Sequence, residues 1–152
     1  QKTDHLLLKW PNDILVNKKK IAGILIETIS KGNKISDIYI GIGINLKFCP
    51  KAVKYKTTSF FKEGIFNIKR KEIIDKIIIL FNYWEDQIKK NDNDFIIKNW
   101  IKRGWPIGTI LSVKQKNNFI KATYQGIDKD GSLRLLINNK IQNFFDIEAI
   151  EL

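Results

Sequence analysis

Four polar residues interrupt a stretch of the chain that otherwise has the composition of β-strands. Residues 9–27, KWPNDILVNKKKIAGILIE, contain runs of Ile, Leu and Val, and the polar interruptions are Lys9, Asn12, Asp13 and Lys20. Lysine ammonium groups neutralise phosphate and carboxylate, and amide and carboxylate oxygens bind Mg²⁺ or accept hydrogen bonds. Pro11 lacks a ladder donor and favours an extended residue before it, so regular pairing should stop there and expose the polar groups. The pattern predicts a ligand site, or a structural cap, at a break in a sheet.

A β-hairpin must position these groups. The apolar runs 6–10 and 14–16 precede the polar tract 17–20, which we expect to turn the chain, and residues 21–29 then run back as a long strand. If the turn centres near Lys18, Asp13 lies roughly opposite Gly23. A glycine at that position would let a ligand approach the backbone, although the spacing fits a simple β-bulge equally well.

A second strand is expected at residues 35–46. From Ile38 onward every second residue is Ile or Leu, and the residues between them include Gly41, Gly43 and Asn45. One face of this strand is therefore aliphatic and the other is open. The glycines lie inside a strand pattern and open no helix, so they are not a dinucleotide fingerprint. Asn45 fits either a turn residue at the end of the strand or a ligand contact.

The rest of the chain predicts a loop, two helices and a small β-domain. Residues 48–67 show no sustained period, whereas apolar residues recur at helical spacing over 69–89, and a second helix is expected over 95–102. Short apolar runs then arrive at 109–116, 119–127, 132–137 and 140–145, the cadence of a five-stranded SH3-like barrel. Asp128 and Asp130 could be paired carboxylates, but Asp-Lys-Asp-Gly between strands is typical of a turn. The fold class is thus α+β, with a domain boundary between residues 103 and 104.

Composition narrows the function classes. The chain has 152 residues, a formal charge of +11, one cysteine and one histidine, His5, so it predicts neither an internal disulfide nor a His/Cys zinc site. The positive charge is compatible with nucleic-acid binding, but only three of the basic residues are arginine. Nearly all of the excess positive charge lies in residues 1–103, where it would also favour binding of a polyanion such as ATP. No apolar run is long enough for a membrane span and the N-terminus has no signal-peptide layout, so a cytoplasmic location is the default expectation.

Three motifs, in this order and at this spacing, closely resemble the biotin protein ligase family. They are KWPND at residues 9–13, KIAGILIE at residues 20–27 and GIGIN at residues 41–45. Residues 126–133, GIDKDGSL, look like part of that family's small C-terminal domain. The resemblance implies a class II synthetase-like mixed sheet with helices, the biotin and lipoate ligase fold, in residues 1–103, and an SH3-like β-barrel in residues 104–152.

The resemblance also implies an activity. Such enzymes join biotin and ATP to give biotinyl-5′-AMP and pyrophosphate, and then pass biotin to a lysine of the biotin carboxyl carrier domain of acetyl-CoA carboxylase. By motif position, it assigns catalysis to Lys20, Asp13 and Lys9; biotin binding to Lys20 and Gly23; ATP binding to Lys9, Asn12 and Asn45; and an Mg²⁺ contact, through phosphate, to Asn12. In this chemistry the cations stabilise charge at the α-phosphate and the biotin carboxylate, and Asp13 orients the reacting groups or takes the proton of the incoming lysine.

This sequence departs from the family pattern in two ways. The family's Gly/Arg-rich biotin loop precedes KWPND by several tens of residues, whereas this sequence starts eight residues before that motif. We therefore expect an incomplete chain, the C-terminal part of the catalytic domain plus the small domain, that is inactive alone. The aromatic residue that covers adenine in the repressor-type member has only Tyr55, Phe60 and Phe61 as candidates here.

Two other functions compete with the ligase reading, and the oligomeric state stays open. The first is a non-catalytic basic module that binds nucleic acid or a carrier protein, with nucleic acid disfavoured by the scarcity of arginine. The second is a lipoate ligase, which shares the architecture but is disfavoured by the KIAG motif. A homodimer is neither indicated nor excluded by the sequence.

Overall fold

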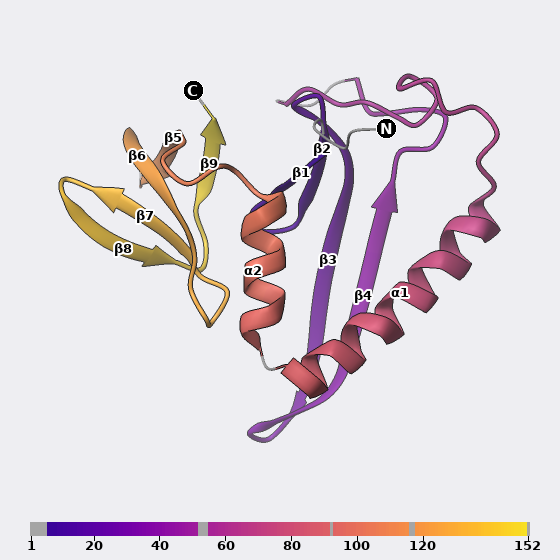
Figure 1. The fold of residues 1–152 in the computed structure, drawn as a ribbon, viewed down its shortest axis with the longest axis horizontal. Coiled ribbons are helices and arrows are strands. Elements are labelled where there is room, and N and C mark those ends of the chain that lie inside the picture. Colours follow the sequence, from indigo (N-terminus) through magenta and orange to yellow (C-terminus); the bar gives the residue numbers. More distant parts are fainter. Residues whose placement is uncertain (1–5, 52–54, 92, 116–117, 152) are drawn as a thin grey trace. The chain divides into compact units, whose positions relative to one another are not determined.

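The computed structural model describes residues 6–51, 55–91, 93–115 and 118–151, which form two compact units, Gln1–Ile68 and Lys69–Leu152 (Figure 1). In the first unit the strands are β1 (Leu6–Lys9), β2 (Asp13–Val16), β3 (Lys19–Lys31) and β4 (Lys34–Ile44). The second unit contains α1 (Arg70–Asn91), α2 (Asn93–Arg103), β5 (Ile110–Gln115), β6 (Asn118–Ile127), β7 (Leu133–Ile137), β8 (Lys140–Phe144) and β9 (Glu148–Glu151). The α+β class is confirmed.

The first unit is a four-stranded antiparallel meander in the order β1-β2-β3-β4. The predicted hairpin is confirmed, and Asp13 pairs with Gly23 as expected. Its turn is tighter than predicted, because Asn17 and Lys18 adopt positive φ angles of 51° and 60°, as in a two-residue turn, and β3 already begins at Lys19. The break at Pro11 is itself a chain reversal, since β1 pairs antiparallel with β2.

The long hairpin of β3 and β4 has the two contrasting faces that the alternation predicted. Gly23 pairs with Gly43 and Leu25 pairs with Gly41, so glycine dominates one face at the end of the hairpin where Ala22 pairs with Ile44. On the other face Ile24 pairs with Ile42, and the aliphatic alternation continues along both strands. One face of this sheet therefore leaves room beside the backbone, and the other presents a continuous aliphatic surface.

The second unit joins the two helices to a five-stranded antiparallel sheet in the order β8-β7-β6-β5-β9. Its core is formed by fully buried side chains from alternate positions of the strands, namely Leu111, Val113, Tyr124, Leu133 and Leu135. Both predicted helices are confirmed to within a few residues, and the four predicted apolar runs correspond to β5–β8. The last strand, β9, was not among those runs. Among the described strands no pairing between β8 and β9 closes the sheet, so the predicted SH3-like barrel is not confirmed.

Asp128 and Asp130 lie in the turn between β6 and β7, as the Asp-Lys-Asp-Gly sequence predicts. The backbone amide of Lys129 and the side chain of Asn143 donate to Asp128, and Ser132 donates to Asp130 through both its amide and its hydroxyl. These hydrogen bonds hold the pKa of each carboxyl below its ordinary value. The two carboxylates stabilise a turn.

The division into units does not coincide with the predicted domain boundary. Compactness groups α1 and α2 with the second sheet, whereas the sequence placed them with the first. The boundary between residues 103 and 104 stays a prediction. Neither helix in the described part of the chain is long and apolar enough to span a membrane.

Candidate active site

A β-bulge brings the predicted catalytic residues together. Ile14 pairs with Ala22 but Leu15 pairs with Lys20, so Ile21 is an extra residue on β3. Without this bulge, strand alternation would place Lys20 and Gly23 on opposite faces, because three positions separate them. With it, Lys20 lies on the face that carries Asp13 and Gly23.

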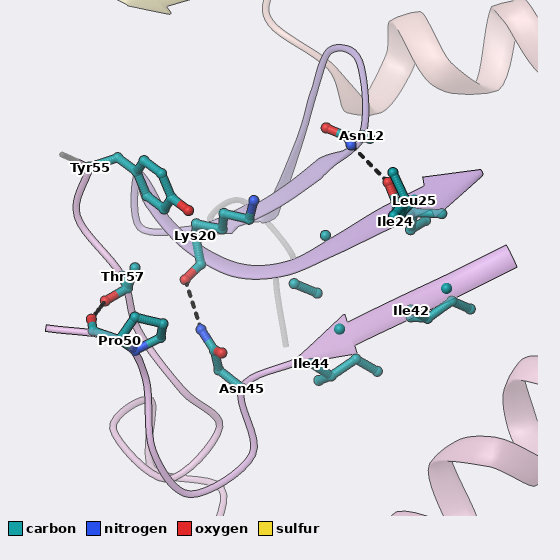
Figure 2. A pocket seen from close by; sticks show the side chains of 14 residues that line it. Asn12, Lys20, Ile24, Leu25, Ile42, Ile44, Asn45, Pro50, Tyr55 and Thr57 are labelled. Carbon is teal, nitrogen blue, oxygen red and sulfur yellow. Dashed lines mark hydrogen bonds between the residues drawn. The ribbon is translucent and has the colours of Figure 1, made fainter. Parts of the chain in front are cut away.

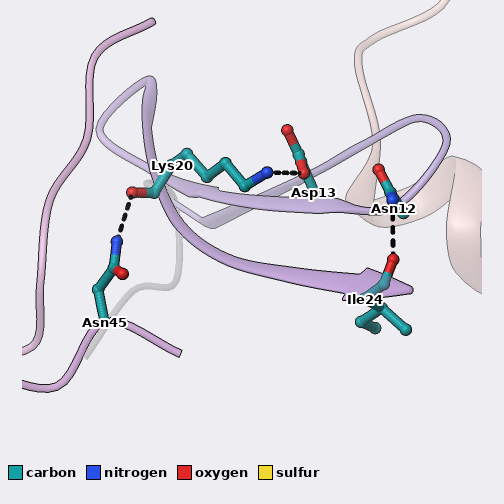
Figure 3. Close-up of polar contacts among 5 residues, drawn as sticks. All are labelled: Asn12, Asp13, Lys20, Ile24 and Asn45. Atoms are coloured by element: carbon teal, nitrogen blue, oxygen red, sulfur yellow. Dashed lines mark hydrogen bonds and ion pairs between the residues drawn. The ribbon is translucent and has the colours of Figure 1, made fainter. Parts of the chain in front are cut away.

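Lys20 and Asp13 form an ion pair on this face (Figure 3). The Lys20 Nζ lies 2.5 Å from Asp13 Oδ1, and the two side chains are 26% and 17% exposed. Lys9 pairs with Asp13 across the β1–β2 hairpin, and directly paired residues share a face. The structure therefore gathers all three residues that the motif assigns to catalysis.

Gly23 lies directly beneath this ion pair. A Cβ atom built on Gly23 would lie 3.1 Å from both Cε and Nζ of Lys20, and 3.3 Å from Asp13 Oδ1. A Cβ atom on Gly41 or Gly43 would meet its nearest neighbours only at 3.8 or 3.9 Å, which are ordinary contact distances. Among these three glycines, only Gly23 makes room for another side chain of the site.

The backbone of Lys20 is held on both edges. On one edge it pairs with Leu15 of β2. On the other edge its amide donates to Lys56 O at 2.9 Å and its carbonyl accepts from the Thr58 amide at 2.9 Å, which forms a short parallel bridge with residue 57. The loop that follows β4 thus acts as an extra short strand that fixes the start of the Lys20 side chain.

Asn45 attaches that loop to β3. Its side-chain amide donates to Thr58 O at 2.9 Å and to Lys20 O at 3.4 Å, as Figures 2 and 3 show in part. Its backbone amide donates to Ile21 O, and its backbone carbonyl accepts from the amide of Phe60. The side-chain nitrogen of Asn45 therefore binds protein carbonyls. The predicted contact of Asn45 with ATP would have to use its side-chain oxygen, and it stays a prediction.

A second group of hydrogen bonds ties the same loop to the β2–β3 turn. Glu63 accepts from the hydroxyl of Thr58 at 2.5 Å and from the side-chain amide of Asn17 at 2.8 Å. Thr58 and Ser59 are 1% and 0% exposed, so the loop is anchored by buried polar groups. The sequence analysis missed these residues, because Glu63 follows Thr58 by five positions and not by the three positions of a capping box.

Asn12 extends the pairing of β2 and β3 by one position. Its side-chain amide donates to Ile24 O at 2.7 Å (Figure 3), and its backbone carbonyl accepts from the Ile24 amide at 2.9 Å. The predicted contact of its amide oxygen with phosphate-bound Mg²⁺ stays a prediction. Within the described part of the chain, no group of three or more His, Cys, Asp or Glu residues could hold a metal by itself, and His5 lies outside that part.

Lys20 and its neighbours line a pocket of about 640 Å³ in the first unit (Figure 2), whereas Lys9 and Asp13 are not among the residues that line it. Its walls are the glycine-containing parts of β3 and β4 together with residues Asn12, Lys20, Asn45, Pro50, Tyr55 and Thr57. The Tyr55 ring centroid lies 5.2 Å from the Lys20 ammonium, within range of a cation–π contact. Of the aromatic residues considered for adenine, Tyr55 lines the pocket, whereas Phe61 packs edge-on against Phe66.

Known proteins resemble this chain in both sequence and fold. Residues 1–45 match the model of the Biotin/lipoate A/B protein ligase family. The chain is 29% identical, over 86% of its length, to the biotin--[acetyl-CoA-carboxylase] ligase of Paracoccus denitrificans, and 32% identical, over 93% of its length, to the bifunctional ligase/repressor BirA of Bacillus subtilis. It covers 57% and 45% of those two proteins, so it spans about half the length of the curated relatives it matches.

Solved structures of the same fold include the biotin protein ligase of Aquifex aeolicus. Its apo structure matches 97% of this chain and 66% of its own with a TM-score of 0.78 at 22% identity, and a complex of that protein with biotin and ATP matches equally well. The fold of this chain is therefore similar to that of the Aquifex aeolicus biotin protein ligase. Within that class, the resemblance to the biotin protein ligases that the three sequence motifs indicated is confirmed by the curated relatives.

Proposed function

We propose that this chain contributes one wall of the catalytic site of a biotin protein ligase, with biotin, ATP and the biotin carboxyl carrier domain of acetyl-CoA carboxylase as its substrates. The observation that carries the proposal is the Lys20–Asp13 ion pair at the edge of a glycine-lined pocket. The named relatives support it, because they are ligases or ligase/repressors that share this part of their sequence.

In the first half-reaction, a carboxylate oxygen of biotin attacks the α-phosphorus of ATP, and the bond to the β-phosphate breaks to release pyrophosphate. Negative charge grows on the α-phosphate during this step, and a cation held nearby stabilises it. Lys20 is suited to this role because its backbone is fixed on both edges and needs little reorganisation. Lys9, on the same face, would support the phosphate side.

In the second half-reaction, the amine of the acceptor lysine attacks the acyl carbon of biotinyl-5′-AMP and AMP leaves. The attacking amine must lose a proton, and Asp13 is the carboxylate that the structure places on the glycine-lined face. Mg²⁺, bound through the ATP phosphates with the Asn12 amide oxygen as a protein contact, would neutralise phosphate charge. Asn45 Oδ1 would face the nucleotide.

The proposal extends to the second unit. In the strand order β8-β7-β6-β5-β9, β5 is the first strand of this sheet along the chain, and it pairs with both β6 and β9, the second and the last. This order agrees with an SH3-like topology. We assign this sheet to the small C-terminal domain of the ligase architecture. The proposal assigns this reaction to the cytoplasm, where ATP is available.

The test is a Lys20→Ala substitution in the protein as the cell produces it. Loss of a cation that stabilises the transition state should slow biotin-dependent pyrophosphate release by about 2 to 4 kcal/mol, or roughly 30- to 1,000-fold. Lys19→Ala is the matched control, because Lys19 is exposed and precedes the bulge on the same strand. Near-normal adenylate formation by Lys20→Ala would refute the catalytic role of Lys20. A preference of the wild-type protein for lipoate over biotin would instead identify it as a lipoate ligase.

A further inference from the structure

We propose that Gly23 is a positioning residue: its missing side chain keeps open the space in which the Lys20 ammonium meets Asp13. The sequence suggested a different reason for this glycine, namely close approach of a ligand to the backbone. The inference rests on the proposed function only for its catalytic consequence, because the geometry itself is independent of any ligand.

The distances show which contact a side chain at position 23 would disturb. A Cβ atom at 3.1 Å from the Lys20 Cε and Nζ atoms is too close for an unstrained contact, so the end of the lysine must move. Its ammonium is bounded by Asp13 at 2.5 Å on one side and by the Tyr55 ring, 5.2 Å away, on another. A shift that relieves the contact with Cβ therefore acts directly on the ion pair.

The backbone of Gly23 needs no glycine for conformational reasons. Gly23 is not among the glycines with positive φ angles, and it lies inside β3 with regular partners on both sides, Asp13 and Gly43. Glycine inside a strand weakens the strand relative to alanine, because it loses more conformational freedom on folding. Position 23 thus retains a residue that is unfavourable for the strand, and the space beneath Lys20 supplies the reason.

Gly23→Ala should therefore change the geometry of the site without lowering the stability of the protein. The variant should unfold at the same or a higher denaturant concentration than the wild type, whereas adenylate formation should fall by about 10- to 100-fold, the loss expected for a catalytic group displaced by a fraction of an ångström. In the Lys20→Ala background, Gly23→Ala should cause no further loss, because the side chain that it displaces is absent.

A second readout does not depend on ligase activity. The Lys20 side-chain resonances in ¹³C,¹⁵N-lysine NMR spectra, assigned by their loss in Lys20→Arg, report the ion pair, and Asp13→Asn defines their position when the pair is broken. Gly23→Ala should move these resonances toward the Asp13→Asn position. Gly43→Ala is the matched spectroscopic control, because Gly43 lies directly opposite Gly23 and its Cβ would make only a 3.9 Å contact.

The outcomes separate the two proposals. Wild-type Lys20 resonances in Gly23→Ala would overturn the role of Gly23, as would a further loss of activity in the Lys20→Ala background, which would mean that position 23 acts on the substrate. Unfolding of Gly23→Ala at a clearly lower denaturant concentration than the wild type would also overturn it and indicate a packing role. If the wild-type protein forms no adenylate at all, the proposed function fails, and the NMR comparison still decides the role of Gly23.

Discussion

Substitution of Asn45 should loosen the loop that holds Lys20. In the structure, the Asn45 amide donates to Thr58 O at 2.9 Å and to Lys20 O at 3.4 Å, and residue 58 is buried. In Asn45→Ala both donors are lost. Lys20 O keeps the hydrogen bond from the Thr58 amide, so the main cost is the unsatisfied carbonyl of Thr58.

The lost hydrogen bonds set the free-energy cost of Asn45→Ala. A buried acceptor left without a partner costs about 1 to 3 kcal/mol, and the long bond to Lys20 O adds little. Asn45→Asp should cost more than Asn45→Ala, because it replaces the donor with a carboxylate oxygen that faces two carbonyls. The loss is local, since the strands of the meander keep their own pairing.

Hydrogen exchange is the suitable assay because it resolves local opening. The amides of Lys20 and Thr58 bond across the junction between β3 and the loop, and the amide of Phe60 bonds the loop to the carbonyl of Asn45; the exchange of all three should accelerate by about 5- to 150-fold in Asn45→Ala. Amides of the β7–β8 hairpin serve as an internal reference. Asn67→Ala is the control substitution, because residue 67 is exposed and the same chemical change there should have almost no effect. Exchange within about twofold of the wild type in both Asn45 variants would refute the role of this clamp.

Three further predictions concern the second unit. Burial raises the pKa of Tyr124 to about 12, so its contribution to stability is present below pH 10 and is lost as the pH rises from about 10 to 12; in alkaline urea titrations Tyr124→Phe should remove roughly 2 to 3 kcal/mol of that pH dependence. Leu135→Ala should lower the free energy of unfolding by about 2 to 5 kcal/mol because Leu135 is 0% exposed, whereas Ile141→Ala, at 53% exposure, should cost less than about 1 kcal/mol, and equal effects would contradict the assignment of the core. Asn139 has a φ angle of 60° in the β7–β8 turn, so Asn139→Gly should be tolerated while Asn139→Val should cost about 1 to 2 kcal/mol in thermal unfolding, and an equally stable valine variant would count against this turn.

The sequence alone predicted the parts of the site that depend on short-range periodicity. Counting back from a turn near Lys18 placed Asp13 opposite Gly23, and this pairing holds because the bulge at Ile21 offsets the tighter turn at Asn17 and Lys18. The same alternation predicted the aliphatic and glycine-lined faces of the β3–β4 hairpin, and helical spacing predicted α1 and α2. Motif resemblance then identified Lys9, Asn12, Asp13 and Lys20 as the chemical groups, although their assigned roles stay predictions.

Only the tertiary structure decided how Lys20 reaches Asp13. Simple alternation would have placed Lys20 and Gly23 on opposite faces, and the bulge at Ile21 reverses that outcome by one residue, a change that no count along the strand reveals. The bulge lies where Asn45 and residues 56–58 bond to the edge of β3, and these partners are 13 to 38 positions from one another in the chain. Contacts at such separation depend on how the loop folds back on the sheet, which is why the sequence names the residues of the site and the fold determines which of them meet.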